Sequence, residues 1–245
     1  MKTTHKSILK LAISIFFAYI AVIFFLIVSG CKKDNDVNGN DNFSLSDNYM
    51  KGTIANWDLG DGMDIKVIVN GTSDIIVAGG GEISSNGGFE FTLSNIPATN
   101  NYLGPLSDFF SGYEDCDVNM DYSNNETKRT LNEIIIAVYS GQDYIGNLYR
   151  SNRQNPDLYW YDDLEEGDIW IELMYLSMDV VVDGTILCPD ADELYEEETH
   201  LNFKYGWNEF IMYCTIASSD HYKVENLSAE PKDKNIKWYF NQVDK

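Results

Sequence analysis

The chain has 245 residues, of which 39 are Asp or Glu and 17 are Lys or Arg, so its formal net charge is −22. Nucleic acids and anionic lipid surfaces repel a protein of this charge, and we therefore exclude nucleic acid as a partner. Hydrophobic residues make up 44% of the chain and aromatic residues 13%. This composition supplies a folded core over most of the length.

The first 30 residues predict an export signal. Residues 1–7 carry basic side chains and no acid, and residues 8–28 are mostly apolar. The apolar run approaches the roughly 20 residues of a membrane-spanning helix, so an uncleaved anchor is the alternative.

The segment Val28–Cys31 resembles the lipobox of bacterial lipoproteins. This resemblance implies cleavage before Cys31 and lipidation of its thiol, with acyl chains such as palmitate. We expect the mature protein to be held on the outer membrane by this lipid, facing the periplasm or exposed at the cell surface.

Residues 31–47 are polar and rich in residues that prefer turns, which predicts a flexible tether. Four of them match the opening of a calcium-binding loop, Asp34, Asp36, Asn38 and Gly39. Leu45 stands where such a loop requires Glu, so the tether is the better interpretation. Lys32–Asp36 also resembles the export signal of Bacteroidota surface lipoproteins.

The remainder predicts an all-β fold, an antiparallel β-sandwich, because short runs with alternating apolar residues recur and no long run has a helical period. The runs are residues 64–69, 89–93, 134–139, 169–176, 180–187, 203–216 and 236–240. Brief helical turns are expected only near residues 105–110, 126–132 and 190–199.

Two segments resemble known families. Lys51–Ile54 and Gly79–Pro97 resemble the opening strand and later hairpin of the transthyretin-like or carboxypeptidase-regulatory-like β-sandwich. The closing strands are similar to those of uncharacterised Bacteroidota lipoproteins, a resemblance that implies no chemistry. We expect either a sandwich segment at 48–124 followed by a second at 125–245, or one large sandwich.

Three cysteines remain besides Cys31 in an oxidising compartment. Cys188 and Cys214 lie on predicted strands, and we predict a disulfide between them, with buried free thiols as the alternative. Cys116 is flanked by acids that should raise its pKa, which makes it a poor nucleophile.

The sequence shows no catalytic motif. His200 and His221 follow acidic residues, which predicts that both lie in solvated loops. The sequence has no G-x-S-x-G motif that would supply a nucleophile to pair with them. No C-x-x-C or H-x-x-x-H pair suggests zinc.

Two acidic clusters are interpreted as solvated loops. The alternative is a calcium site, since calcium binds several oxygen ligands, and calcium is the one cofactor that the sequence suggests. The members of the two clusters are Asp162, Asp163, Glu165, Glu166 and Asp168, and Asp190, Asp192, Glu193, Glu196, Glu197 and Glu198.

The candidate ligand-binding segment is Tyr159, Trp160, Tyr161, Asp162 and Asp163, because sugars stack on flat aromatic rings and bond to neighbouring polar groups. The alternative is an alternating strand that buries Trp160.

We expect a non-enzymatic binding or structural protein with a membrane contact through its lipid and a glycan or protein partner. The alternatives are a carbohydrate-binding protein or carboxylate-based glycan hydrolase, and a fimbria-like subunit. A hydrolase requires an enclosed cleft with converging acids of raised pKa, whereas a binding protein does not.

Overall fold

The computed structural model describes residues 48–111, 115–154, 165–189, 194–232 and 234–243. These residues are mostly in strands, which confirms the all-β prediction. No helix in these ranges has the length and apolar composition needed to cross a membrane.

The structure has a short helix, α2 (Ser107–Phe110), among many strands. The strands are β1 (Tyr49–Thr53), β2 (Met63–Asn70), β3 (Ile75–Ile83), β4 (Gly88–Thr92), β5 (Leu103–Pro105), β6 (Asp117–Tyr122), β7 (Lys128–Thr130), β8 (Ile134–Ser140), β9 (Asp143–Ser151), β10 (Ile169–Leu176), β11 (Val180–Pro189), β12 (Leu194–Phe203), β13 (Gly206–Ala217), β14 (His221–Leu227) and β15 (Lys237–Gln242).

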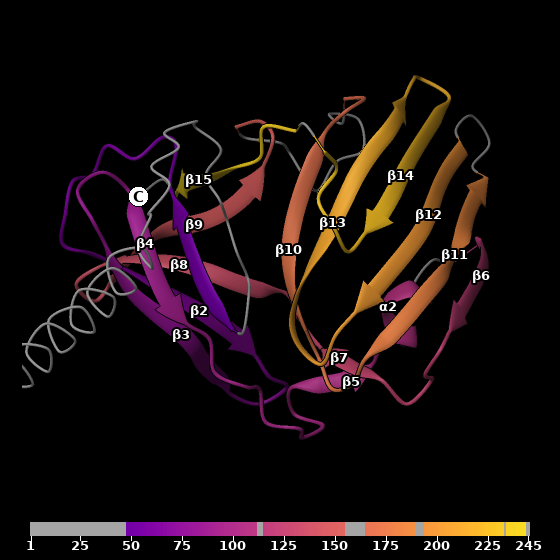
Figure 1. The fold of residues 1–245 in the computed structure, drawn as a ribbon, viewed down its shortest axis with the longest axis horizontal. Coiled ribbons are helices and arrows are strands. Elements are labelled where there is room, and N and C mark those ends of the chain that lie inside the picture. The colour runs from indigo at the N-terminus through magenta and orange to yellow at the C-terminus, as the bar shows by residue number, and fades with distance from the viewer. Residues whose placement is uncertain (1–47, 112–114, 155–164, 190–193, 233, 244–245) are drawn as a thin grey trace, which may run out of the picture. The chain divides into compact units, whose positions relative to one another are not determined.

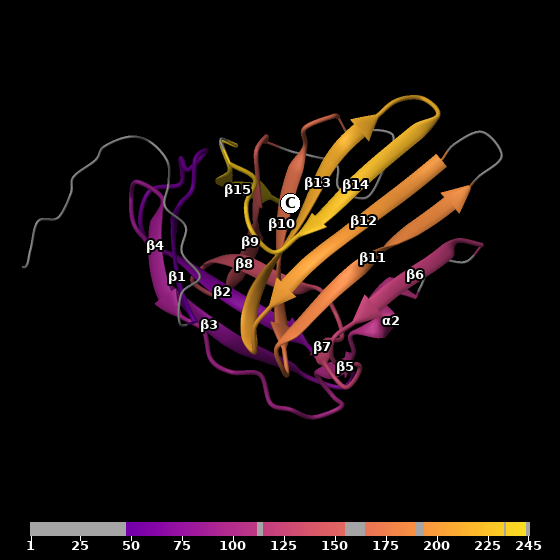
Figure 2. The same ribbon diagram turned by 45° about the vertical axis from the view of Figure 1, so that its right-hand side comes forward.

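The strands form a two-stranded sheet, β1-β4, and a 13-stranded sheet with the order β3-β2-β8-β9-β10-β13-β14-β12-β11-β6. β15 pairs with β9, and β7 pairs with β5 and β10. β12 and β14 run parallel, whereas the other paired strands are antiparallel. Figure 1 shows β10, β13, β14, β12, β11 and β6 as one broad array, and Figure 2 shows β1 and β4 layered on β2 and β3 at the other end.

One core lies between the two sheets. Ile65, Val67 and Val69 of β2 are fully buried, each at 0% exposure, as their alternation predicts. They belong to one cluster with Phe89 and Phe91 of β4. This packing gives the predicted sandwich arrangement.

A second core lies under α2. Phe110 of this helix and Leu106 before it pack with Val182, Leu201 and Phe210 of the large sheet. The helical turn predicted near residues 105–110 is thereby confirmed.

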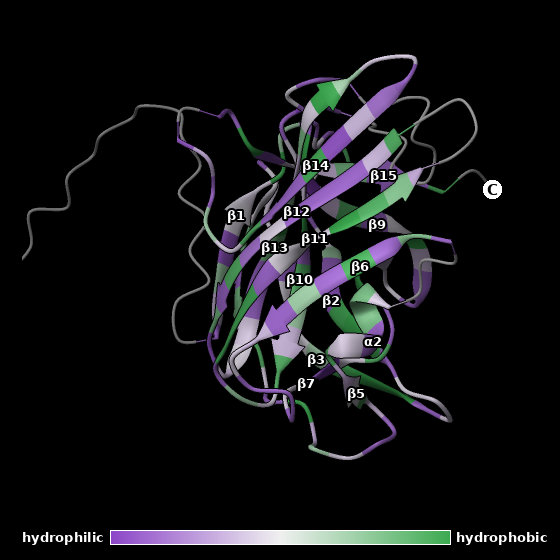
Figure 3. Ribbon diagram, turned by 90° about the vertical axis from the view of Figure 1, so that its right-hand side faces the viewer, coloured by the Kyte–Doolittle hydropathy of each residue, from purple (hydrophilic) through white to green (hydrophobic). Residues whose placement is uncertain are grey.

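The other two helical predictions are wrong. Residues 128–130 form β7, and Leu194–Phe203 form β12, although 190–193 lie outside the described residues. The run of acids in β12 resembles the sequence of a solvated loop, but in the strand successive acidic side chains point to opposite faces of the sheet. Glu197 turns inward at 6% exposure, and Glu196 and Glu198 turn outward to Lys223, 2.9 and 2.7 Å from its Nζ. Figure 3 shows the hydrophilic residues along β12 and β14.

Asp183-Gly184 lies inside β11. Gly184 is needed there because β6 approaches closely. A Cβ atom at this position would stand 2.2 Å from the carbonyl oxygen of Asn119.

The expected boundary between residues 124 and 125 does not divide the described residues. β2 pairs with β8 and β6 pairs with β11, each across that point, and all the described residues belong to one unit, Asn40–Lys245. Turn residues mark where a strand ends, but they do not reveal which distant strand it will pair with.

Candidate functional site

A polar groove opens where β12 turns into β13, with a volume of about 700 Å³, within the range of ligand pockets. It is lined by Asn48, Asn95, Asn202, Lys204, Tyr205, Gly206, Trp207, Asn208, Glu209 and Ser228. These residues come from the entry to β1, the segment after β4, the β12–β13 connection and the end of β14. Strand pairing therefore gathers the groove from distant parts of the chain.

Asn208 fixes the shape of the β12–β13 turn. Its Oδ1 accepts a hydrogen bond from the Lys204 backbone N–H at 2.9 Å, and its Nδ2 donates to the carbonyl oxygens of Lys204 and Gly206 at 2.7 and 2.9 Å. Gly206 has a φ of 98°, a conformation that favours glycine. The turn is thus held by a side chain of its own.

Tyr205 presents an aromatic ring to solvent, with 56% exposure. Its backbone N–H donates to Asp179 Oδ1 at 2.7 Å, and its hydroxyl oxygen accepts a hydrogen bond from the Tyr175 hydroxyl at 3.2 Å. The two rings pack edge to face with centroids 6.0 Å apart. Because Tyr175 is buried, its pKa is raised, and the exposed ring of Tyr205 is anchored on a fixed neighbour.

Trp207 packs against the pair of rings formed by Tyr205 and Tyr175, through contact with Tyr175. Its ring is 7% exposed and meets that of Tyr175 edge to face at 5.5 Å. Its Nε1 donates to the carbonyl oxygen of Ser94 at 2.9 Å, which links β13 to the segment that follows β4.

The amides of the groove retain bonding capacity. Asn48 Nδ2 donates to Asn95 Oδ1 at 3.4 Å, and the Asn202 backbone N–H donates to Ser228 Oγ at 3.0 Å. Among the described residues, no hydrogen bond engages the side-chain amide of Asn202 or the Nδ2 of Asn95. These groups can therefore donate to and accept from a hydroxylated ligand.

Among the described residues that line this groove, Glu209 is the one carboxylate. It forms an ion pair with Arg150, and Arg150 Nη2 also lies 2.5 Å from Glu230 Oε1. Burial raises the pKa of Glu209 to about 7, the nearby charge of Glu230 adds to the rise, and Arg150 opposes it.

A second groove, of about 940 Å³, lies around the end of β3 and the strands β1 and β4. Among the described residues that line it are Asp61, Glu82 and Glu90 and a single aromatic residue, Phe89, which is 4% exposed. These described residues therefore present no exposed aromatic ring on which a sugar could stack.

Several predicted sites lie outside the described residues. These are the lipidation site Cys31, the segment Tyr159–Asp163, and the acids Asp190, Asp192 and Glu193. Of the remaining predicted calcium ligands, Asp168 is 4% exposed and lies 2.7 Å from Arg153 Nη2. Within the described ranges, no three His, Cys, Asp or Glu side chains are placed to hold a metal ion.

The disulfide prediction is wrong in its pairing. Cys188 bonds to Cys116, with the two Cα atoms 4.3 Å apart, and Cys214 is a buried free thiol. The β6–β11 register pairs Leu187 with Asp117 and so brings the two cysteines opposite each other. Cys214 lies on β13, with β14 and β12 between it and β11. Burial raises its pKa to about 11.

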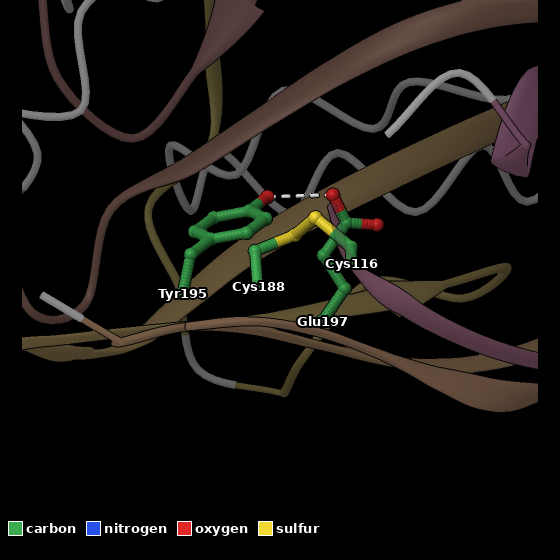
Figure 4. Close-up of a disulfide and its surroundings, with 4 residues drawn as sticks. All are labelled: Cys116, Cys188, Tyr195 and Glu197. Carbon is green, nitrogen blue, oxygen red and sulfur yellow. Dashed lines mark hydrogen bonds between the residues drawn. A yellow bond between two sulfur atoms is a disulfide. The ribbon is translucent and has the colours of Figure 1, made fainter. Parts of the chain in front are cut away.

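Tyr195 and Glu197 of β12 lie beside this disulfide, as Figure 4 shows. The Tyr195 hydroxyl donates to Glu197 Oε1 at 2.6 Å. Asn226 Nδ2 donates to Glu197 Oε2 at 3.0 Å and to Thr199 Oγ1 at 3.1 Å. The buried carboxylate is thus satisfied by neutral donors.

The two histidines lie on strands, not in loops as predicted. His200 of β12 bonds to Asp183 and Glu198 at 3.2 and 3.0 Å, and both acids raise its pKa. His221 begins β14, and its Nε2 lies 3.5 Å from Glu196. These contacts are with acids that face outward, and no nucleophile takes part in them.

The groove was not predicted from the sequence. One signal was present in the sequence, since Tyr205-Gly206-Trp207-Asn208 combines two aromatic residues with an amide. Comparison with family models, curated proteins and solved structures gave no match to this chain.

Proposed function

We propose that this protein is a lipid-anchored component of the cell envelope that binds carbohydrate in the groove at the β12–β13 turn. The observation that carries the proposal is the ring of Tyr205, which is exposed and yet held in place by Tyr175 and Asp179. A fixed aromatic face binds a sugar ring with little loss of side-chain entropy.

The neighbouring polar groups support the same ligand class. Among the described residues, the Nδ2 of Asn95 and the side-chain amide of Asn202 have no hydrogen-bond partner, and Ser228 adds a hydroxyl group. A few placed polar groups beside an aromatic surface are typical of sites that orient small hydroxylated ligands. The lipid anchor rests on the lipobox-like Val28–Cys31.

The test is glycan binding by the full chain purified in detergent, screened on a broad panel of oligosaccharides and measured by calorimetry. Tyr205→Ala should weaken binding about tenfold, the effect of losing roughly 1.4 kcal/mol of ring contact. Tyr144→Ala is the matched control, because Tyr144 is also exposed, at 42%, and does not line the groove. If no glycan binds, or if the two variants weaken binding equally, the proposal fails.

A further inference from the structure

Glu209 is placed to act on a bound ligand. Glu209 is one of the residues that line the groove, and its side chain is 16% exposed. Its Oε1 forms the ion pair with the guanidinium of Arg150. Among the described residues, Oε2 has no hydrogen-bond partner. This oxygen can therefore accept a hydrogen bond from a sugar hydroxyl.

The charges around Glu209 do not balance. Among the described residues, Arg150, at 3% exposure, pairs with both Glu209 and Glu230, so one positive charge faces two negative ones there. The other charged residue of the groove, Lys204, lies 3.2 Å from Asp179 and is offset by it. When its acids are ionised, the groove therefore carries an excess negative charge that repels anions.

We propose that Glu209 determines the ligand class of the groove, by accepting a hydrogen bond from a neutral sugar and by repelling acidic sugars. This inference rests on the proposed carbohydrate binding and adds the charge of the ligand to it. A charged acceptor bonds more strongly to a hydroxyl group than a neutral acceptor does. The same carboxylate thus favours one class and disfavours the other.

The pH dependence should follow the ionisation of Glu209. Because burial raises its pKa to about 7, the discrimination should be nearly full at pH 8, about half of that at pH 7, and weaker still as the pH falls further. Among the described residues, the charged groups that face Glu209 are Arg150 and Glu230, and Lys204 is the other charged residue that lines the groove. Acidic sugars stay ionised over this range.

The experiment compares the full chain and Glu209→Gln in detergent at pH 8, with the tetramer of N-acetylglucosamine as the neutral probe and tetragalacturonate as the acidic probe. In Glu209→Gln we expect the affinity for the neutral probe to fall several-fold. The affinity for the acidic probe should rise about fivefold, the effect of removing one charge ~8 Å away at an effective dielectric constant of about 40. Opposite changes in one variant cannot come from loss of folding, which would lower both affinities.

Two further variants complete the test. Glu230→Gln should raise the affinity for tetragalacturonate without lowering that for the neutral probe, because it removes the excess charge and leaves Glu209 in place. Glu126→Gln, at an exposed position outside the groove, controls for the overall charge of the protein and should change neither affinity.

Equal or parallel changes for the two probes in Glu209→Gln would overturn the inference while leaving carbohydrate binding intact. If the wild-type chain binds neither these probes nor any other glycan, the proposed function itself fails, and the inference fails with it.

Discussion

Glu172 is an ionisable side chain placed among buried apolar residues of β10. Its neighbours on the same face of the strand, Trp170 and Met174, are 7% and 4% exposed. Burial and the charge of Glu133 raise its pKa to about 7, and Arg129 opposes the rise. Both faces of this strand are covered, since Ile171 and Leu173 on the opposite face are 9% and 8% exposed. Ionising Glu172 is therefore unfavourable, because its carboxylate would lie among apolar side chains that exclude water.

Glu172→Gln should change how stability depends on pH. A carboxyl group whose pKa is raised by folding binds its proton more tightly in the folded state, so stability falls as the pH rises from about 4.5 to about 7. The substituted chain lacks this loss. Its stability relative to wild type should therefore increase by up to about 3 kcal/mol between pH 5 and pH 8, at 1.36 kcal/mol per pKa unit. Denaturant unfolding at both pH values measures the difference.

Glu126→Gln is the control for Glu172→Gln, since Glu126 is exposed, and it should show no such increase. If the stability difference between Glu172→Gln and wild type is the same at both pH values, Glu172 does not titrate in this range.

At the scale of elements, the sequence predicted strands well where alternation separates apolar from polar residues, as in β2 and β4. The sequence-based prediction was wrong at β12, where three successive acids suggested a solvated loop. The inward-facing Glu197 is tolerated there because Asn226, on a strand later in the chain, donates a hydrogen bond to it. The sequence-based prediction also missed the groove, whose amides come from segments that only the sheet order brings together. Local patterns do not specify such pairings.

The disulfide Cys116–Cys188 fastens the edge strand β6 to β11 and closes a loop of 72 residues. Replacing both cysteines by serine should lower the free energy of unfolding by about 4 kcal/mol, because the unfolded chain regains the entropy of that loop. Urea unfolding measures this loss. Hydrogen exchange should show the fastest new opening in Asp117–Tyr122.

Cys214→Ala is the control for this pair, since it removes a buried thiol and keeps the disulfide. Cys214→Ala should lower the free energy of unfolding by clearly less than the replacement of both disulfide cysteines does. An equal loss in the control would mean that the covalent bond contributes little to stability.

At the scale of the whole molecule, the large sheet unites strands from both sides of the expected boundary at residues 124 and 125. The parallel bridge between Ile54 and Trp238 brings the start and the end of the described chain together. Because the groove needs Asn48 and Asn95 as well as Ser228, neither half of the chain can form it alone. The groove and the fold therefore belong to the same unit.

Attachment to the membrane should, by contrast, depend on residues outside that unit. We expect Cys31→Ser to move the protein from the membrane fraction to the soluble envelope fraction, because the thiol that would carry the lipid is lost. Fractionation followed by immunoblotting measures the distribution, and the melting temperature should not change. Asn35→Ser is the control and should stay with the membrane. A Cys31→Ser chain that also remains there would favour the uncleaved anchor helix.

Asn48, which lines the groove, is also the first residue that the structure describes. Residues 31–47 can span at most about 60 Å, so a lipid on Cys31 would confine the groove to that distance from the bilayer. A glycan on the same membrane would then meet the groove at an effective concentration near the millimolar range. A site that is too weak to capture a sugar from free solution would be occupied most of the time under this confinement, and its fast release would let the protein sample many chains in succession.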